Sequence, residues 1–145
     1  MICIGVDPGL SRVGLALGQG ELALGIESCP ADSSLERIEE LCIEKGAERI
    51  YVGLPLSLSG QESNSTKSAV QFASAVAEHT GLDVYLIDER LTSAHSLKLS
   101  RAAGKSSKES KSFIDAEAAR LIVESAIASK HNLGVRLGDY LAADH

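Results

Sequence analysis

The chain has 145 residues, a hydrophobic content of 44% and a formal net charge of −6. This composition indicates one globular domain with a sizeable core and argues against a generally basic, nucleic-acid-coating surface. No apolar run reaches the roughly 18 residues that a membrane-spanning helix needs, and the three cysteines lack zinc-site spacing, so we expect a cytoplasmic protein with reduced thiols and no membrane contact.

The first part of the chain predicts an antiparallel meander followed by a helix. An apolar run over residues 1–7 predicts a buried strand, residues 13–17 predict a second, and residues 21–27 predict a third. Turn residues between the first two runs favour a hairpin. Apolar residues at helical spacing after Ser34 then predict a helix that ends at Gly46.

Strands and helices alternate in the rest of the chain. We expect strands over 49–54 and 84–88, helices over 67–79, 93–103 and 113–130, and polar loops over 57–66 and 104–111. Strands separated by helices call for parallel crossovers, so the sequence predicts an α/β fold with one mixed sheet and helices on both faces. No internal repeat or second domain is visible, so we expect a single domain over residues 1–131, and weak patterning predicts a frayed C-terminal tail over 132–145.

Three acids stand where a carboxylate is costly or rigidly placed. Asp7 ends the first apolar strand, Glu89 follows the strand at 84–88, and Asp115 lies just inside the last predicted helix. A buried carboxylate must be paired, protonated or bound to a cation. Carboxylates that converge from rigid elements bind Mg²⁺ or Mn²⁺, and two such ions can clamp a phosphoryl displacement. The three acids together predict a divalent-metal site.

Each acid also has a purely structural interpretation. Asp7 precedes Pro8 and is compatible with an Asx-type turn. Glu89 can be a polar residue where a strand reaches the surface, and Asp115 can be a helix N-terminal acid favoured by the macrodipole. The residues taken singly leave both interpretations open, and their joint occurrence in this order of elements favours the metal site.

Four ordered segments carry a family resemblance: Gly5-Val6-Asp7-Pro8-Gly9 with Arg12-Val13-Gly14-Leu15-Ala16, Val52-Gly53-Leu54-Pro55-Leu56, Asp88-Glu89-Arg90-Leu91-Thr92-Ser93 and Asp115-Ala116-Glu117-Ala118-Ala119. They resemble the YqgF/RuvX family, RNase H-like proteins described as pre-16S rRNA nucleases and formerly as Holliday junction resolvases. The resemblance covers about residues 1–128. It implies an RNase H-like fold with a five-stranded mixed sheet, and an Mg²⁺- or Mn²⁺-dependent phosphodiesterase site with Asp7, Glu89 and Asp115 as catalytic and metal-binding residues.

Basic residues near the predicted site are candidates for phosphate contacts, because such contacts dominate nucleic-acid affinity. The predicted nucleic-acid-binding residues are Arg12, Arg90, Arg101, Lys105, Lys108 and Lys111. The alternative is an ordinary solvated loop, or, for Arg90, a pairing with Asp88. Ser11 stands where the family usually has Lys, and Glu109 interrupts the basic stretch. These differences weaken the inference about nucleic-acid binding and leave the inference about metal chemistry unchanged.

The expected function is a metal-dependent nuclease that acts on structured RNA, with pre-16S rRNA 5′-end processing as the role that the resemblance implies. The alternatives are a Holliday junction resolvase-like DNA endonuclease, which would need a dimer to cut two symmetric strands, and a non-catalytic nucleic-acid-binding protein. The residues leave open the choice of RNA or DNA, exo- or endonuclease mode, the preferred metal, the oligomeric state, and whether the loop at 57–66 closes over substrate.

Overall fold

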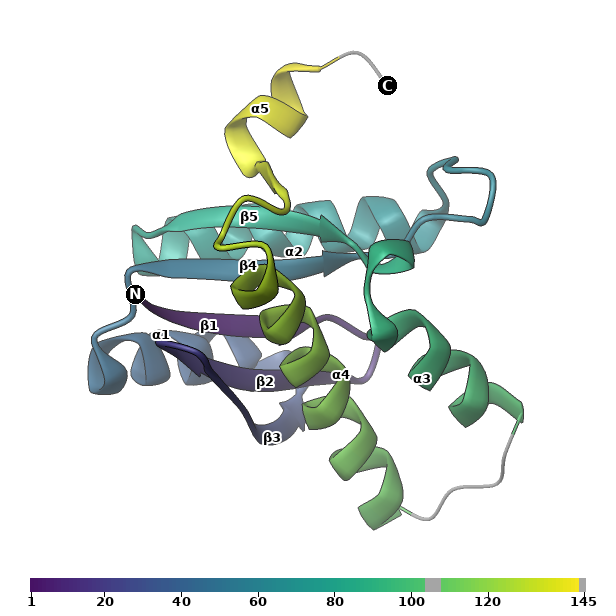
Figure 1. Ribbon diagram of the computed structural model, residues 1–145, viewed down its shortest axis with the longest axis horizontal. Coiled ribbons are helices and arrows are strands. Elements are labelled where there is room, and N and C mark those ends of the chain that lie inside the picture. Colours follow the sequence, from purple (N-terminus) through teal and green to yellow (C-terminus); the bar gives the residue numbers. More distant parts are fainter. Residues whose placement is uncertain (104–107, 144–145) are drawn as a thin grey trace.

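The computed structural model describes residues 1–103 and 108–143, and for residues 100–103 and 108–110 it describes the backbone alone. A single mixed sheet forms the centre of the molecule, with helices on both faces (Figure 1). Its strands are β1 (Ile2–Asp7), β2 (Arg12–Gln19), β3 (Leu22–Pro30), β4 (Arg49–Leu54), β5 (Asp83–Asp88) and β6 (Val135–Arg136). The helices are α1 (Ser34–Lys45), α2 (Asn64–Thr80), α3 (Ser93–Ala103), α4 (Lys108–Ala128) and α5 (Leu137–Ala142), with 3-10 turns at η1 (Ala31–Ser33) and η2 (Glu89–Leu91).

The strand order β3-β2-β1-β4-β5-β6 confirms the predicted combination of an antiparallel meander and parallel crossovers. β1 pairs antiparallel with β2 and parallel with β4, which pairs parallel with β5. The expected number of five strands is wrong, because the described residues contain a sixth, β6, which pairs antiparallel with β5 through Val135 and Arg136. A two-residue strand is too short to show alternation. Part of the segment predicted as a frayed tail therefore joins the sheet, and Leu137 of α5 is buried.

Two apolar layers hold the helices on the sheet. On one face, Ile4 and Val6 of β1 pack in a core with residues of α1 and α2; on the other, Cys3 packs in a core with residues of α3 and α4. Because successive strand residues point to opposite faces, Asp7 has the same orientation as Cys3. The last residue of β1 therefore projects toward the α3–α4 side.

Helix α2 begins at Asn64, before the predicted start at residue 67. The cause is a capping box: Ser63 Oγ accepts from the backbone nitrogen of Thr66, and Thr66 Oγ1 accepts from the backbone nitrogen of Ser63. Thr66 takes the place where Glu or Gln usually closes such a box, so the sequence signal is weak. The mobile loop predicted over 57–66 is shortened accordingly.

Helix α4 also begins earlier than predicted, at Lys108 instead of Phe113. Lys, Glu and Ser in this stretch show no apolar period, although Lys and Glu are good helix formers. Asp115 consequently lies about two turns into the helix. The macrodipole acts mainly on the first turn, so it does not account for this buried acid.

The cysteines are free thiols inside the core. Cys3, Cys29 and Cys42 are all buried and unpaired with one another. Burial raises the pKa of Cys3 and Cys42 to about 11, so these thiols stay protonated and unreactive near neutral pH. Across residues 1–103 and 108–143, no helix is long and apolar enough to cross a membrane.

Candidate active site

Asp7 and Glu89 meet around one ammonium group. Asp7 is 4% exposed and Glu89 is 3% exposed. The Nζ atom of Lys98, on α3, lies 2.5 Å from Asp7 Oδ1 and 2.6 Å from Glu89 Oε1. Two of the three predicted acids are thus brought together, and a lysine that the sequence did not single out joins them.

The sheet and a 3-10 turn place Glu89. β1 and β5 run parallel with β4 between them, so their carboxyl ends reach the same edge of the sheet. Glu89 starts η2, where Thr92 Oγ1 donates to the Glu89 carbonyl at 3.0 Å. A Cβ atom at Gly53 of β4 would lie 2.7 Å from Glu89 Oε1. The missing side chain at Gly53 therefore leaves room for the Glu89 carboxylate.

Burial and charge make the Asp7 carboxylate unusual. Burial raises the pKa of Asp7 to about 7; Lys98 opposes this rise, and the neighbouring Glu89 carboxyl adds to it. Although burial acts to lower the pKa of Lys98, the two carboxylates raise it above its ordinary value. Lys98 is therefore protonated at neutral pH and supplies one positive charge to a pair of acids.

Asp115, the third predicted acid, has partners other than Lys98. It is 6% exposed, its Oδ2 atom lies 2.8 Å from a guanidinium nitrogen of Arg12, and the hydroxyl of Ser28 donates to the same oxygen at 2.9 Å. Gly14 pairs with Asp7 across β1 and β2. A Cβ atom at Gly14 would collide with the Asp115 carbonyl, so α4 packs directly onto the strand next to Asp7.

The donor set at the Asp7–Glu89 pair suits a hard divalent cation. Its ligands are carboxylate oxygens, and Asp7 Oδ1 is buried without an aligned hydrogen bond, despite its ion pair with Lys98. As the side chains stand, no group of three His, Cys, Asp or Glu within the described part of the chain is placed to hold a metal ion. A three-acid site would need the Asp115 side chain to turn away from Arg12.

Arg90 is engaged by the protein itself. Its guanidinium lies 2.6 Å from Asp88 Oδ2 and donates to the carbonyl of Leu58 at 3.3 Å. Burial acts to raise the pKa of Asp88, but the hydrogen bonds that Arg90 donates to the Asp88 carboxylate lower it below its ordinary value. A Cβ atom at Gly60, which has φ +83°, would lie 3.2 Å from the same guanidinium. Arg90 therefore ties the loop between β4 and α2 to the end of β5.

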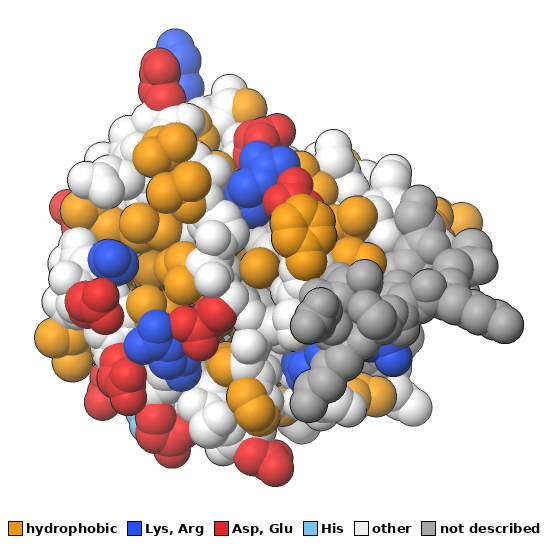
Figure 2. Space-filling model, turned by 90° about the horizontal axis from the view of Figure 1, so that it is seen from below, with side chains coloured by type: hydrophobic (Ala, Val, Ile, Leu, Met, Phe, Trp, Pro, Cys, Tyr) orange, Lys and Arg blue, Asp and Glu red, His pale blue; other side chains and the backbone are white. Residues whose placement is uncertain are grey.

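The other predicted nucleic-acid contacts are only partly visible. Arg12 pairs with Asp115, and Lys111 is exposed on α4. Lys105 lies outside the described residues, as do the side chains of Arg101 and Lys108. On the face shown in Figure 2, several Lys and Arg side chains lie beside Asp and Glu side chains, and the described residues visible there form no continuous basic patch.

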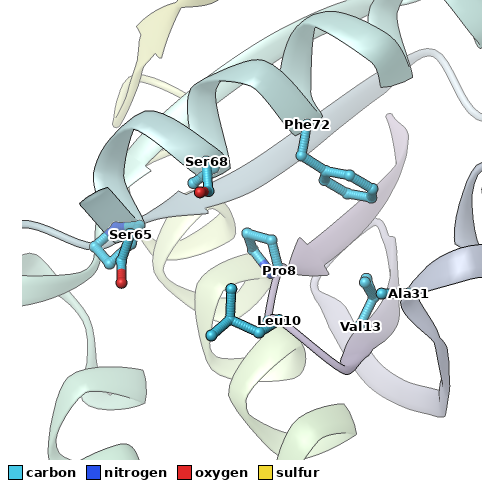
Figure 3. A pocket seen from close by; sticks show the side chains of 10 residues that line it. Pro8, Leu10, Val13, Ala31, Ser65, Ser68 and Phe72 are labelled. Carbon is cyan, nitrogen blue, oxygen red and sulfur yellow. The ribbon is translucent and has the colours of Figure 1, made fainter. Parts of the chain in front are cut away.

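A separate apolar cavity of about 250 Å³ lies where the turn after β1 meets α2 (Figure 3). Pro8, Leu10 and Phe72 supply apolar walls, and Ser65 and Ser68 supply hydroxyl groups. Its walls belong to the α1–α2 side of the sheet, whereas Asp7 projects toward α3 and α4. The cavity therefore begins next to Asp7 in the sequence, at Pro8, but lies on the other face of the sheet from the Asp7 carboxylate.

Several residues that shape the site were not predicted from the sequence. Lys98 follows Glu89 by nine positions on a helix of ordinary polar composition, and Ser28 lies in β3, far from Asp115 along the chain. Gly14 and Gly53 matter for the room that they leave. The family motifs contain both glycines, but only the packing shows which atoms need that room.

The sequence model of the RuvX family, described as Holliday junction resolvase, matches residues 1–129 of the chain. The chain belongs to the RuvX family. This confirms the resemblance seen in the four motifs, since the match includes all of them. It also spans every described element that supplies a residue to the site.

Several curated relatives of this RuvX chain bear the name "Putative pre-16S rRNA nuclease". One from Clavibacter sepedonicus is 36% identical over 137 residues, covering 90% of this chain and 85% of the relative. One from Leifsonia xyli subsp. xyli is 36% identical over 129 residues, covering 86% and 83%. One from Chloroflexus aggregans is 29% identical over 134 residues, covering 89% and 94%.

Solved structures of RuvC share the fold of this RuvX chain. Thermus thermophilus RuvC in complex with a Holliday junction substrate superposes with a TM-score of 0.57 at 15% identity, covering 94% of this chain and 99% of RuvC. The structure described as Thermus thermophilus RuvC gives 0.52 at 19% identity with the same coverage. These similarities confirm the predicted RNase H-like fold.

Proposed function

We propose that the protein is an Mg²⁺- or Mn²⁺-dependent nuclease that hydrolyses phosphodiester bonds in RNA, with 5′-end processing of pre-16S rRNA as its role. The observation that carries the proposal is the convergence of Asp7 and Glu89, both buried, on one cation at the carboxyl edge of the sheet. Ligands bind at this edge in open α/β sheets. The RuvX family match and the names of the relatives support the choice of reaction and substrate.

Asp7, Glu89 and Asp115 are the proposed metal ligands and catalytic residues. A bound divalent ion would activate water and neutralise charge that develops on the phosphate. The protein holds the ligands on rigid supports: Asp7 on β1, Glu89 on η2, and Asp115 on α4 against Gly14. Such support keeps carboxylates within productive geometry.

Arg12 and Lys111 are the proposed phosphate-contacting residues on the described surface, together with Arg101, Lys105 and Lys108. When Asp115 turns toward the other acids, the guanidinium of Arg12 loses its partner next to the site. A cation released there is placed to bind a substrate phosphate. Lys111 is exposed on α4, four residues before Asp115 of the same helix. Arg90 acts through the loop that it ties to Asp88.

A cleavage assay on matched substrates tests the proposal. Labelled structured RNA, single-stranded DNA and four-way DNA junctions are incubated with Mg²⁺, Mn²⁺ or EDTA. We expect metal-dependent cleavage of RNA that Asp7→Asn, Glu89→Gln and Asp115→Asn each abolish, with circular dichroism spectra like that of the wild type. Asp83→Asn is the control, since Asp83 pairs with Arg136 at the protein surface. Absence of cleavage with either metal, or full activity of Asp7→Asn, would contradict the nuclease.

The same assay separates the alternatives. Preferred, symmetric cutting of four-way junctions would instead assign a Holliday junction resolvase-like activity, which the description of the family names. Binding of RNA or DNA without cleavage would assign a non-catalytic nucleic-acid-binding protein. End-labelled RNA also distinguishes the two modes of attack, because an exonuclease releases mononucleotides and an endonuclease releases internal fragments.

A further inference from the structure

Lys98 occupies the space between the two proposed metal ligands. Its side chain extends from α3, is 22% exposed, and brings Nζ within 2.6 Å of oxygens of both Asp7 and Glu89. Two buried carboxylates without a cation would repel one another, and each would lose its hydration without gaining a compensating charge. The ammonium therefore stabilises the acid pair in the protein without metal.

We infer that Lys98 is an internal cation that holds the place of the metal between Asp7 and Glu89, and that a divalent ion displaces it on binding. The inference rests on the proposed metal site. The metal and the ammonium need the same oxygens, Asp7 Oδ1 and Glu89 Oε1. Two positive groups cannot share these oxygens at contact distance in a buried setting without strong repulsion.

The lysine side chain suits this exchange. Its long, flexible stem can move the charged end to solvent while the stem stays against the protein. The partial exposure of Lys98 gives it a route outward from the α3 side. An arginine fork or a buried backbone donor at this place would be harder to remove. Lys98 is therefore a positioning residue for the metal-free acids and a competitor of the metal.

Amine labelling tests the displacement directly. Wild-type protein is treated with an amine-acylating reagent in EDTA or in saturating Mn²⁺, and the labelling rate of each lysine is read by mass spectrometry. We expect Lys98 to label slowly in EDTA and at least about fivefold faster with Mn²⁺. Lys45, which pairs with Glu44 at the surface, is the internal control and keeps its rate. Equal protection of Lys98 in both conditions would overturn the displacement.

Metal affinity gives a second, independent readout. Mn²⁺ binding is measured by calorimetry at pH 8.5 for wild type, Lys98→Met and the control Lys45→Met. If Lys98 competes with the metal, Lys98→Met binds Mn²⁺ about tenfold more tightly, and Lys45→Met is unchanged. Unchanged or weaker binding by Lys98→Met means that Lys98 does not compete, and only this inference fails. If no variant binds Mn²⁺, the proposed metal site fails as well.

Thermal unfolding shows whether Lys98→Met is folded under the conditions of the affinity measurement. Lys98→Met leaves two buried carboxylates without their cation, so we expect a lower melting temperature than wild type in EDTA and a larger rise on addition of Mn²⁺. A variant that melts cooperatively in Mn²⁺ is folded, which validates the affinity comparison. A Lys98→Met protein as stable as wild type in EDTA would contradict the stabilising role of the ammonium.

Discussion

The carbonyl oxygen of Asp115 lies 1.9 Å from the position that a Cβ atom would take at Gly14. No residue with a side chain fits at that distance unless the helix or the strand moves. Gly14 pairs with the last residue of β1, which is Asp7. The close approach of α4 to β2 is therefore what brings the third acid to the neighbourhood of the first, although their positions in the sequence are far apart.

Gly14→Ala is expected to push α4 away from the sheet and to lower the free energy of unfolding by about 2 kcal/mol, as overpacking of a close contact does. RNA cleavage is expected to fall with it, because Asp115 moves relative to Asp7. Urea unfolding and the cleavage assay measure the two effects. Gly138→Ala in α5 is the control: its Cβ would meet nothing, so stability changes by less than about 1 kcal/mol. Equal behaviour of the two variants would refute this account of the packing.

Ser28→Ala removes the hydroxyl that donates to Asp115 Oδ2. Partners that orient a ligand typically contribute about 10-fold or more to metal affinity or activity. We therefore expect about a tenfold loss of kcat, with the affinity for RNA unchanged, because Ser28 has no proposed contact with substrate. Ser33→Ala, which removes an exposed hydroxyl that donates to Pro30, serves as the matched control. An unchanged kcat would mean that the hydrogen bond from Ser28 is dispensable for placing Asp115.

Arg90→Met is expected to release the loop at 57–63. The substitution removes the hydrogen bonds to Asp88 and to the carbonyl of Leu58. The rate of hydrogen–deuterium exchange should then rise at the amides of Gly60 and Gln61. These amides donate to the carbonyl and to the hydroxyl of Ser57, respectively, within the same loop. The same exchange rates in variant and wild type would show that Arg90 does not hold the loop.

Salt dependence separates this role from direct phosphate contact. The slope of log affinity for RNA against log salt reports the number of phosphates neutralised. Arg90→Met is expected to leave the slope unchanged, since Asp88 already neutralises Arg90. Lys111→Met, at an exposed position, is expected to reduce the slope by roughly one phosphate contact. A reduced slope for Arg90→Met would restore the sequence-based assignment of Arg90 to nucleic-acid binding.

The sequence predicted what depends on local pattern and missed what depends on packing. Apolar runs and turn residues were enough to predict β1 to β5, and the acids at strand ends were visible because a carboxylate after an apolar run is unusual. Strand β6 was not predicted because two residues are too few to show a hydrophobic period. The start of α2 was not predicted because Thr66, rather than Glu, closes its capping box. The role of Lys98 was not predicted because nothing distinguishes it from other helical lysines in the sequence; only the fold places it beside two buried acids.

The raised pKa of Asp7 sets the pH dependence of stability. In the unfolded chain Asp7 ionises near 3.8, whereas in the folded protein burial raises its pKa to about 7. Between these values the folded state holds a proton that the unfolded state has lost, so this group makes the protein less stable as pH rises from about 4 to 7. Asp7→Asn cannot ionise and escapes this loss. In EDTA, the free energy of unfolding of the variant is therefore expected to exceed that of wild type by about 4 kcal/mol at pH 8, with the difference closing by pH 4.

Urea unfolding across pH 4 to 8 in EDTA measures that difference. Asp83→Asn is the control, because Asp83 is exposed at the start of β5, and its curve should run parallel to that of wild type. In the difference between variant and wild type, the contributions of groups that titrate alike in both proteins to the free energy of unfolding cancel. Added Mn²⁺ should reverse the order at pH 8, since only wild type retains both acids of the pair. An Asp7→Asn protein less stable than wild type at pH 8 in EDTA would show that Asp7 is a structural ion-pair partner of Lys98.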